Sequence, residues 1–93
     1  MVIKSFKHKG LQTFFEAGSK KGILPNHAGK LARLLDRLDA SVTPRDMNLP
    51  GYRLHQLAGE EKGVWSVWVN GNWSATFQFE QENAILVDYR DYH

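Results

Sequence analysis

The stretch that decides the fold is GVWSVWVNGNWSATFQF, residues 63–79. Two alternating apolar runs flank Asn70-Gly71-Asn72, and Asn-Gly between such runs is a strong short-range signal for a β-hairpin. A two-residue loop would mix apolar and polar side chains on each face of the hairpin, whereas a three-residue loop separates them. We therefore predict a three-residue loop with the pairs Val69–Trp73, Val67–Ala75 and Trp65–Phe77.

The predicted hairpin has one face for the core and one face for function. The six paired residues should share the buried, apolar face. The opposite face is polar apart from one tryptophan and carries Ser66, Trp68, Ser74, Thr76 and Gln78. Because successive strand residues point to opposite sides of a sheet, a functional site is expected on this polar face.

Outward from the hairpin, the chain reads as β-α-α-β-β-β-β. Strands are expected over residues 2–6, 52–57 and 84–89, and helices over residues 7–17 and from Pro25 or Asn26 onward. The second helix has an apolar stripe at helical spacing, interpreted as core: Ala28, Leu31, Leu34, Leu35 and Leu38. Short connections between strands favour antiparallel pairing. The expected class is α+β, with two N-terminal helices packed on a small antiparallel sheet.

Length and composition indicate one domain over residues 1–93, since 42% of the residues are hydrophobic and the chain is short. The sequence has no cysteine, which excludes disulfides and thiolate metal sites and suits a reducing compartment. No apolar run reaches the length of a membrane span, and the start MVIKSF lacks the apolar block of a signal peptide. We expect a cytoplasmic protein with no membrane partner.

The formal net charge of +2 hides an asymmetry between the two parts of the chain. Up to Arg53 there are ten basic and four acidic residues, a net charge of +6; after it, two basic residues face six acidic ones, a net charge of −4. A basic half suits a polyanion such as RNA, and a solvated helical surface explains the charge equally well. The basic residues expected to contact such a partner are chiefly Lys20, Lys21, Lys30, Arg33 and Arg37.

The residues that could carry chemistry are few. The four histidines show no metal-ligand spacing, and the sequence has neither a phosphate-binding glycine loop nor a serine-hydrolase elbow. Strand alternation places His55 with Arg53 on the face opposite Leu54, and the terminal Asp91-Tyr92-His93 can fold back beside that face. A lone strand histidine is most often an exposed bystander, and a terminal one usually belongs to a frayed end. The residues alone leave both explanations open.

The chain resembles the HigB-type toxins of bacterial type II toxin–antitoxin systems, in the RelE/ParE superfamily. The resemblance rests on ordered segments that cover nearly the whole chain: IKSFKHKGL at 3–11, NLPG at 48–51, RLH at 53–55, GVWSV at 63–67, VNGNW at 69–73, FQF at 77–79 and DYH at 91–93. Together, the order and spacing of these segments are highly specific.

This resemblance implies a RelE-like microbial ribonuclease fold and a toxin that cleaves mRNA on the translating ribosome. In the family, cleavage proceeds by attack of the ribose 2′-OH with no metal or other cofactor. The positions that match the family's catalytic residues are His55, Asp91, Tyr92 and His93, and Arg53, Trp68 and Ser74 join the expected RNA contacts. The implied partners are a HigA-type helix-turn-helix antitoxin, the ribosome, mRNA and, through the antitoxin alone, operator DNA.

Three positions depart from the family pattern. Family members commonly have a lysine at the position of Ala58, an arginine at Ser74 and often a basic residue at Trp68. A cation beside the reacting phosphate lowers the barrier by roughly 3–4 kcal/mol, so we expect a weakened nuclease. Arg53 or Arg90 could instead supply the charge. Two other classes stay open, a ParE-like gyrase inhibitor and a non-catalytic antitoxin-binding regulator, although the Asp91-Tyr92-His93 ending favours the ribonuclease.

Overall fold

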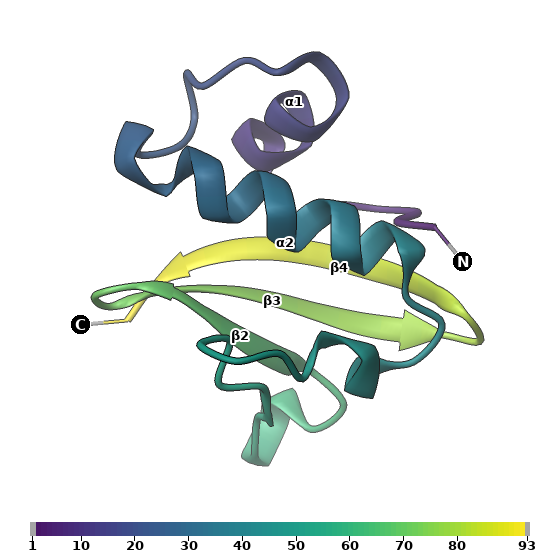
Figure 1. The fold of residues 1–93 in the computed structure, drawn as a ribbon. Helices are drawn as coiled ribbons and strands as arrows, with labels where there is room; N and C mark the ends of the chain where they lie inside the picture. The colour runs from purple at the N-terminus through teal and green to yellow at the C-terminus, as the bar shows by residue number, and fades with distance from the viewer. Residues whose placement is uncertain (1, 93) are drawn as a thin grey trace.

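The computed structural model describes residues 2–92 and consists of two α-helices on one side of a four-stranded antiparallel sheet (Figure 1). In chain order the elements are α1 (Lys9–Ala17), the 3-10 turn η1 (Pro25–His27), α2 (Ala28–Ala40), η2 (Pro44–Met47), β1 (His55–Gln56), η3 (Gly59–Glu61), β2 (Trp65–Asn70), β3 (Trp73–Glu80) and β4 (Asn83–Asp91). The strands lie side by side in sequence order. The predicted α+β class is confirmed.

Within residues 2–92, no helix combines the length and the apolar character that crossing a bilayer requires.

The hairpin has the predicted apolar face but a different loop. Trp65 pairs with Phe77 and Val67 with Ala75, as predicted, and all four residues pack in the core cluster. Asn70, not Val69, pairs with Trp73, because the register shifts at a β-bulge between Trp68 and Asn70. The loop is therefore two residues long. The extra residue in β2 has the same effect on register as a third loop residue, so the apolar side chains still gather on one face.

The structure explains both ends of α1. Nδ1 of His8 accepts a hydrogen bond from the backbone N–H of Leu11 at 3.0 Å, so α1 begins at Lys9 and not at residue 7. Gly18 ends α1 in the left-handed conformation, with φ of 75°. The predicted α2 stripe is buried throughout: Ala28, Leu31, Leu34, Leu35 and Leu38.

Two predicted strands are wrong in extent. Residues 2–6 form only isolated parallel bridges to β4, through Ile3 and Phe6, and no regular strand. The strand expected over residues 52–57 shortens to His55–Gln56. Its first half leaves the extended conformation because Gly51 and Arg53 both have positive φ, 83° and 50°.

The face of the sheet away from the helices is covered in its middle. Ser66 and Thr76 lie opposite each other on β2 and β3, and each is only 1% exposed. The turn η3 lies on this side of the sheet (Figure 1), and its Glu61 reaches Arg90 of β4. The polar face is thus open at its edges and closed near its centre.

Candidate functional site

His55 lies exposed on β1, opposite Ser66 of β2. Its Nδ1 is 2.9 Å from the carbonyl oxygen of Arg53. Because a carbonyl oxygen only accepts hydrogen bonds, Nδ1 carries the proton in this contact. In the neutral ring, Nε2 is then an acceptor that can take a proton from a substrate.

Trp68, on the neighbouring strand, holds two cations over its indole ring. The guanidinium carbon of Arg53 lies 4.2 Å from the ring centroid, and Nζ of Lys30 lies 4.5 Å from it. Nζ of Lys30 also donates to the carbonyl oxygen of Gly51 at 3.1 Å. Cation–π contacts of this kind stabilise an exposed pair by about 0.5–1 kcal/mol. The left-handed φ of Arg53 brings its side chain to this ring and its carbonyl to His55.

This group of positive charges is not neutralised within the part of the chain that the structure describes. Burial lowers the pKa of Lys30, and repulsion from Arg33 and Arg53 lowers it further. Both ion pairs found among residues 2–92 belong to Arg90 instead. We call Lys30, Arg33, Arg53 and Trp68 the basic cluster. Its unbalanced charge suits an anion such as a phosphate.

At the opposite edge of the sheet, Arg90 and Tyr92 form a second polar group. Arg90 lies on β4 opposite Ser74, and its Nη1 donates to the Tyr92 hydroxyl at 3.2 Å. The same nitrogen lies 2.6 Å from Oε2 of Glu61, and Nε lies 3.1 Å from Oδ2 of Asp88. The backbone N–H of Tyr92 donates to the carbonyl oxygen of Asn72 at 2.7 Å, which holds the residue at the end of β4.

The four residues expected at the catalytic site fall in different places. Strand alternation puts His55 and Tyr92 on the same polar face, on the two edge strands of the sheet. Asp91 pairs with Trp73, so the register directs it to the helix side, where its charge acts on the pKa of Tyr89. His93 lies outside the described residues.

The expected RNA contacts also divide. Lys30, Arg33, Arg53 and Trp68 gather in the basic cluster. Ser74 is 9% exposed beside Arg90. Arg37 turns toward η2 instead, where its Nε donates to the carbonyl oxygen of Asp46 at 2.9 Å. Lys20 and Lys21 are exposed in the loop between α1 and η1, on the helix side of the sheet.

Sequence reasoning missed Glu61 and Asp88 as partners of Arg90. Part of this arrangement was visible in the sequence, because Asp88, Arg90 and Tyr92 alternate along β4 and so share one face. Glu61 gave no such signal, since it lies in a polar turn 29 residues away. Among residues 2–92, no three histidine, aspartate or glutamate side chains gather as metal ligands.

A buried histidine–tyrosine pair joins the helices to the sheet on the other side. Nδ1 of His27 lies 2.5 Å from the hydroxyl oxygen of Tyr89, and both residues are buried. The ring of Trp73 packs against both, at 5.8 Å from His27 and 4.4 Å from Tyr89. This pair is structural, because it faces the core and not the polar face.

The His27 pair predicts a pH-dependent stability. Burial lowers the pKa of His27 below its ordinary value of 6.5, so the unfolded chain binds a proton there before the folded chain does. Below about pH 6.5 the free energy of unfolding should therefore fall by up to ~1.4 kcal/mol per pH unit, and above it this group contributes no slope. Urea unfolding between pH 5 and pH 8 measures this. His27→Gln should lose the slope and His55→Gln should keep it; an unchanged slope in His27→Gln contradicts the assignment.

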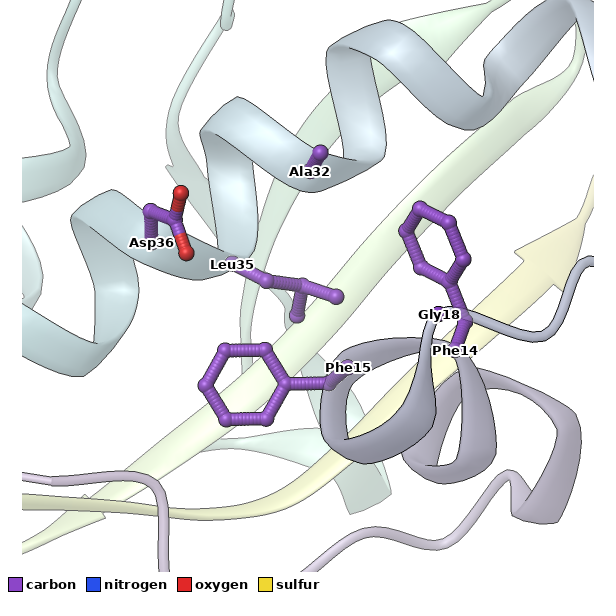
Figure 2. A pocket seen from close by; sticks show the side chains of 6 residues that line it. All are labelled: Phe14, Phe15, Gly18, Ala32, Leu35 and Asp36. Carbon is purple, nitrogen blue, oxygen red and sulfur yellow. The ribbon is translucent and has the colours of Figure 1, made fainter.

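A shallow hollow of about 220 Å³ lies between the helices, away from the polar face. Figure 2 shows that the rings of Phe14 and Phe15 from α1 and the side chain of Leu35 from α2 border it, with Asp36 at one end. One carboxylate among carbon atoms offers no acid–base pair. The polar face remains the candidate site.

Comparison with known proteins identifies the family of the chain. Residues 4–93 match the HigB-like toxin family, described as the RelE-like toxin of the type II toxin–antitoxin system HigB. The chain is 39% identical to "Endoribonuclease HigB" of Proteus vulgaris over 92 residues, covering 99% of this chain and 100% of that protein. It is 33% identical to "Toxin HigB-1" of Vibrio cholerae over 90 residues, covering 95% and 94%. The chain therefore belongs to the HigB-like family of type II toxins.

Proposed function

We propose that this toxin is a ribosome-dependent endoribonuclease that cleaves mRNA by attack of the ribose 2′-OH, without a metal or other cofactor. The observation that carries the proposal is the exposed His55, whose Nδ1 lies 2.9 Å from the carbonyl oxygen of Arg53 and whose Nε2 has no hydrogen-bond partner among residues 2–92. It lies beside the basic cluster, whose cations repel one another. A relative 39% identical over the whole chain is named an endoribonuclease, which supports the same reaction.

The reaction needs a base, an acid and positive charge. The base takes the proton of the 2′-OH, whose oxygen attacks phosphorus to form a 2′,3′-cyclic phosphate. The leaving 5′-oxygen takes a proton from the acid. His55 and His93 are proposed as this pair, since an imidazole changes its protonation state near neutral pH. Tyr92 donates a hydrogen bond to the phosphate. Asp91 points to the helix side of the sheet, so its proposed role is to position the end of the chain and not to contact the phosphate.

The positive charge that stabilises the reacting phosphate is supplied by Arg53 and Lys30, and not by Arg90. Arg90 already faces two carboxylates, within 2.6 and 3.1 Å, so its immediate surroundings are net negative. Arg53 is exposed and lies beside His55. The stacking of Arg53 on Trp68 leaves the guanidinium N–H groups at its edge free to approach phosphate oxygens.

Membership in a type II toxin family implies an antitoxin partner. The finer assignments are proposals: a HigA-type helix-turn-helix antitoxin, operator DNA reached only through it, and the ribosome and mRNA in the cytoplasm. Lys20, Lys21 and Arg37 are placed in contact with ribosomal RNA or the antitoxin. Ser74 is buried opposite Arg90, so it offers no charge and no direct contact to RNA. Phosphate contacts make ribosome binding weaken with salt.

The test is expression of the toxin, with mRNA ends and DNA breaks measured in the same cells. Growth should stop, new mRNA 5′ ends should appear within translated frames, and DNA should stay intact. A chelator of transition metals should leave cleavage by purified toxin on programmed ribosomes unchanged. DNA breaks with intact mRNA would mean gyrase inhibition, and neither effect would mean a non-catalytic antitoxin-binding protein.

The positions of Ala58 and Ser74 predict that cleavage is weakened and that one substitution improves it. Ala58 is exposed at the start of η3, so Ala58→Lys adds a cation without a clash and should raise cleavage tenfold or more, with the melting temperature unchanged. Ser74→Arg lies opposite Arg90, and like charges in such a pair are destabilising, so it should lower the melting temperature without a gain. Ala58→Gln is the matched control. No gain with Ala58→Lys would show that this charge does not limit the reaction.

A further inference from the structure

We infer that Arg90 is a positioning residue, which ties η3 across the polar face to β4 and holds the Tyr92 hydroxyl for the reaction. The inference rests on the proposed function, since it assigns the mechanical support of that same site. It concerns three residues outside the predicted site, Arg90, Glu61 and Asp88.

Arg90 and Glu61 come from opposite edges of the sheet. Arg90 belongs to β4, one edge of the order β1-β2-β3-β4, whereas Glu61 belongs to η3, which follows β1 at the other edge. Their side chains nevertheless meet at 2.6 Å. The segment η3 therefore folds over the polar face toward β4, and the ion pair joins the two above this face.

Small residues beneath the ion pair make this crossing possible. Ser66, Ser74 and Thr76 occupy the middle of the polar face on β2 and β3. All three are buried, although the helices lie on the other side of the sheet. Within residues 2–92, the buried hydroxyl oxygens of Ser66 and Thr76 have no hydrogen-bond partner, which is uncommon for buried groups and shows that what covers them does not bind them. A large side chain at any of these three positions would prevent Glu61 and Arg90 from meeting above the sheet.

The charges around Arg90 favour a role in positioning other side chains over a role in binding phosphate directly. The side chain is 21% exposed and faces Glu61 and Asp88, two carboxylates for one guanidinium. Burial alone would lower its pKa, but the hydrogen bonds to Glu61, Tyr92 and Asp88 raise it on balance. A phosphate approaching this group would meet a net negative charge and would have to displace a carboxylate.

The third side chain that Arg90 contacts is Tyr92, which we infer to be the group that Arg90 positions. Its Nη1 donates to the hydroxyl oxygen of Tyr92 at 3.2 Å. Because that oxygen accepts from Arg90, the phenolic hydrogen is left to donate elsewhere, and Tyr92 is 43% exposed on the open part of the face. Arg90 thus orients the hydroxyl toward a bound phosphate, while Glu61 fixes Arg90 from across the sheet.

The test is a set of charge variants measured by single-turnover cleavage on programmed ribosomes. Glu61→Gln separates the two roles: it should lower the cleavage rate constant roughly tenfold by loosening Arg90, whereas freeing a phosphate-binding arginine would raise it. Glu60→Gln, a change at the exposed neighbour in η3, is the matched control and should have no effect. An increase in Glu61→Gln overturns the inference.

Charge reversal completes the test. Glu61→Arg and Arg90→Glu should each lose activity and lower the melting temperature. The double variant should recover most of the melting temperature, because the ion pair forms again with its ends exchanged. Its activity should stay low, because a carboxylate at position 90 cannot donate a hydrogen bond to the Tyr92 hydroxyl. A melting temperature as low in the double variant as in the single variants overturns the inference, since it shows that the two side chains are not coupled. Wild-type activity in Arg90→Glu also overturns it, since Tyr92 would then need no donor at position 90. If the wild-type toxin cleaves nothing in this assay, the proposed function fails, and the melting temperatures of the four proteins still decide whether the two side chains are coupled.

Discussion

His55→Ala should reduce mRNA cleavage on programmed ribosomes by about 100- to 10,000-fold, the usual contribution of a positioned acid or base. His55 is exposed and contributes no core packing, so the melting temperature should stay unchanged. Its one described hydrogen bond, through Nδ1 to Arg53, fixes the ring without supporting the sheet. The loss should therefore appear in the rate constant for cleavage.

Gln56→Ala is the matched control for this experiment. Gln56 is the other residue of β1, is also exposed, and points to the opposite side because successive strand residues alternate. The control should cleave like the wild type. Equal activity in His55→Ala and Gln56→Ala would show that His55 is a bystander and would remove it from the mechanism.

Arg53→Gln should reduce cleavage by about 100- to 1,000-fold, the effect of removing one preset donor to developing negative charge. The guanidinium is the cation nearest to His55 along the chain. Arg53 takes part in neither of the two ion pairs found among residues 2–92. Losing one phosphate contact should also reduce the slope of ribosome affinity against salt concentration. Single-turnover rates and binding at several salt concentrations measure both effects.

Arg45→Gln controls for the loss of a positive charge in general. Arg45 is exposed on η2, and the change removes the same charge as Arg53→Gln. It should leave the rate constant close to that of the wild type. If the two variants lose activity equally, the chain uses its net charge and no specific phosphate contact at Arg53.

Periodicity was enough to predict which residues of the hairpin are buried, and it was not enough to predict the loop. A third loop residue and a bulge at Val69 bring the same side chains to the same face, so the apolar pattern cannot distinguish them. The strand expected over residues 52–57 failed for a different reason. Its pattern alternates correctly, but Arg53 has positive φ, a conformation that the residue type does not signal.

The site could be predicted only where the functional residues are close along the chain. Arg53 and His55 are two residues apart and share a strand-like alternation, so their common face was visible in the sequence. The Glu61–Arg90 pair crosses the sheet from edge to edge and depends on small residues at three positions between them. Nothing local in the sequence links an acid in a turn with an arginine of the last strand, so this contact needed the structure.

The chemical ends of the RNA fragments test most directly the claim that the ribose 2′-OH is the nucleophile. Purified toxin would be added to ribosomes stalled on a defined mRNA, and the two new ends would be identified by mass spectrometry. Attack by the 2′-OH predicts a 2′,3′-cyclic phosphate or 3′-phosphate on the upstream fragment and a 5′-hydroxyl on the downstream fragment. A 3′-hydroxyl with a 5′-phosphate would contradict it, because those ends require attack by water and expulsion of the 3′-oxygen.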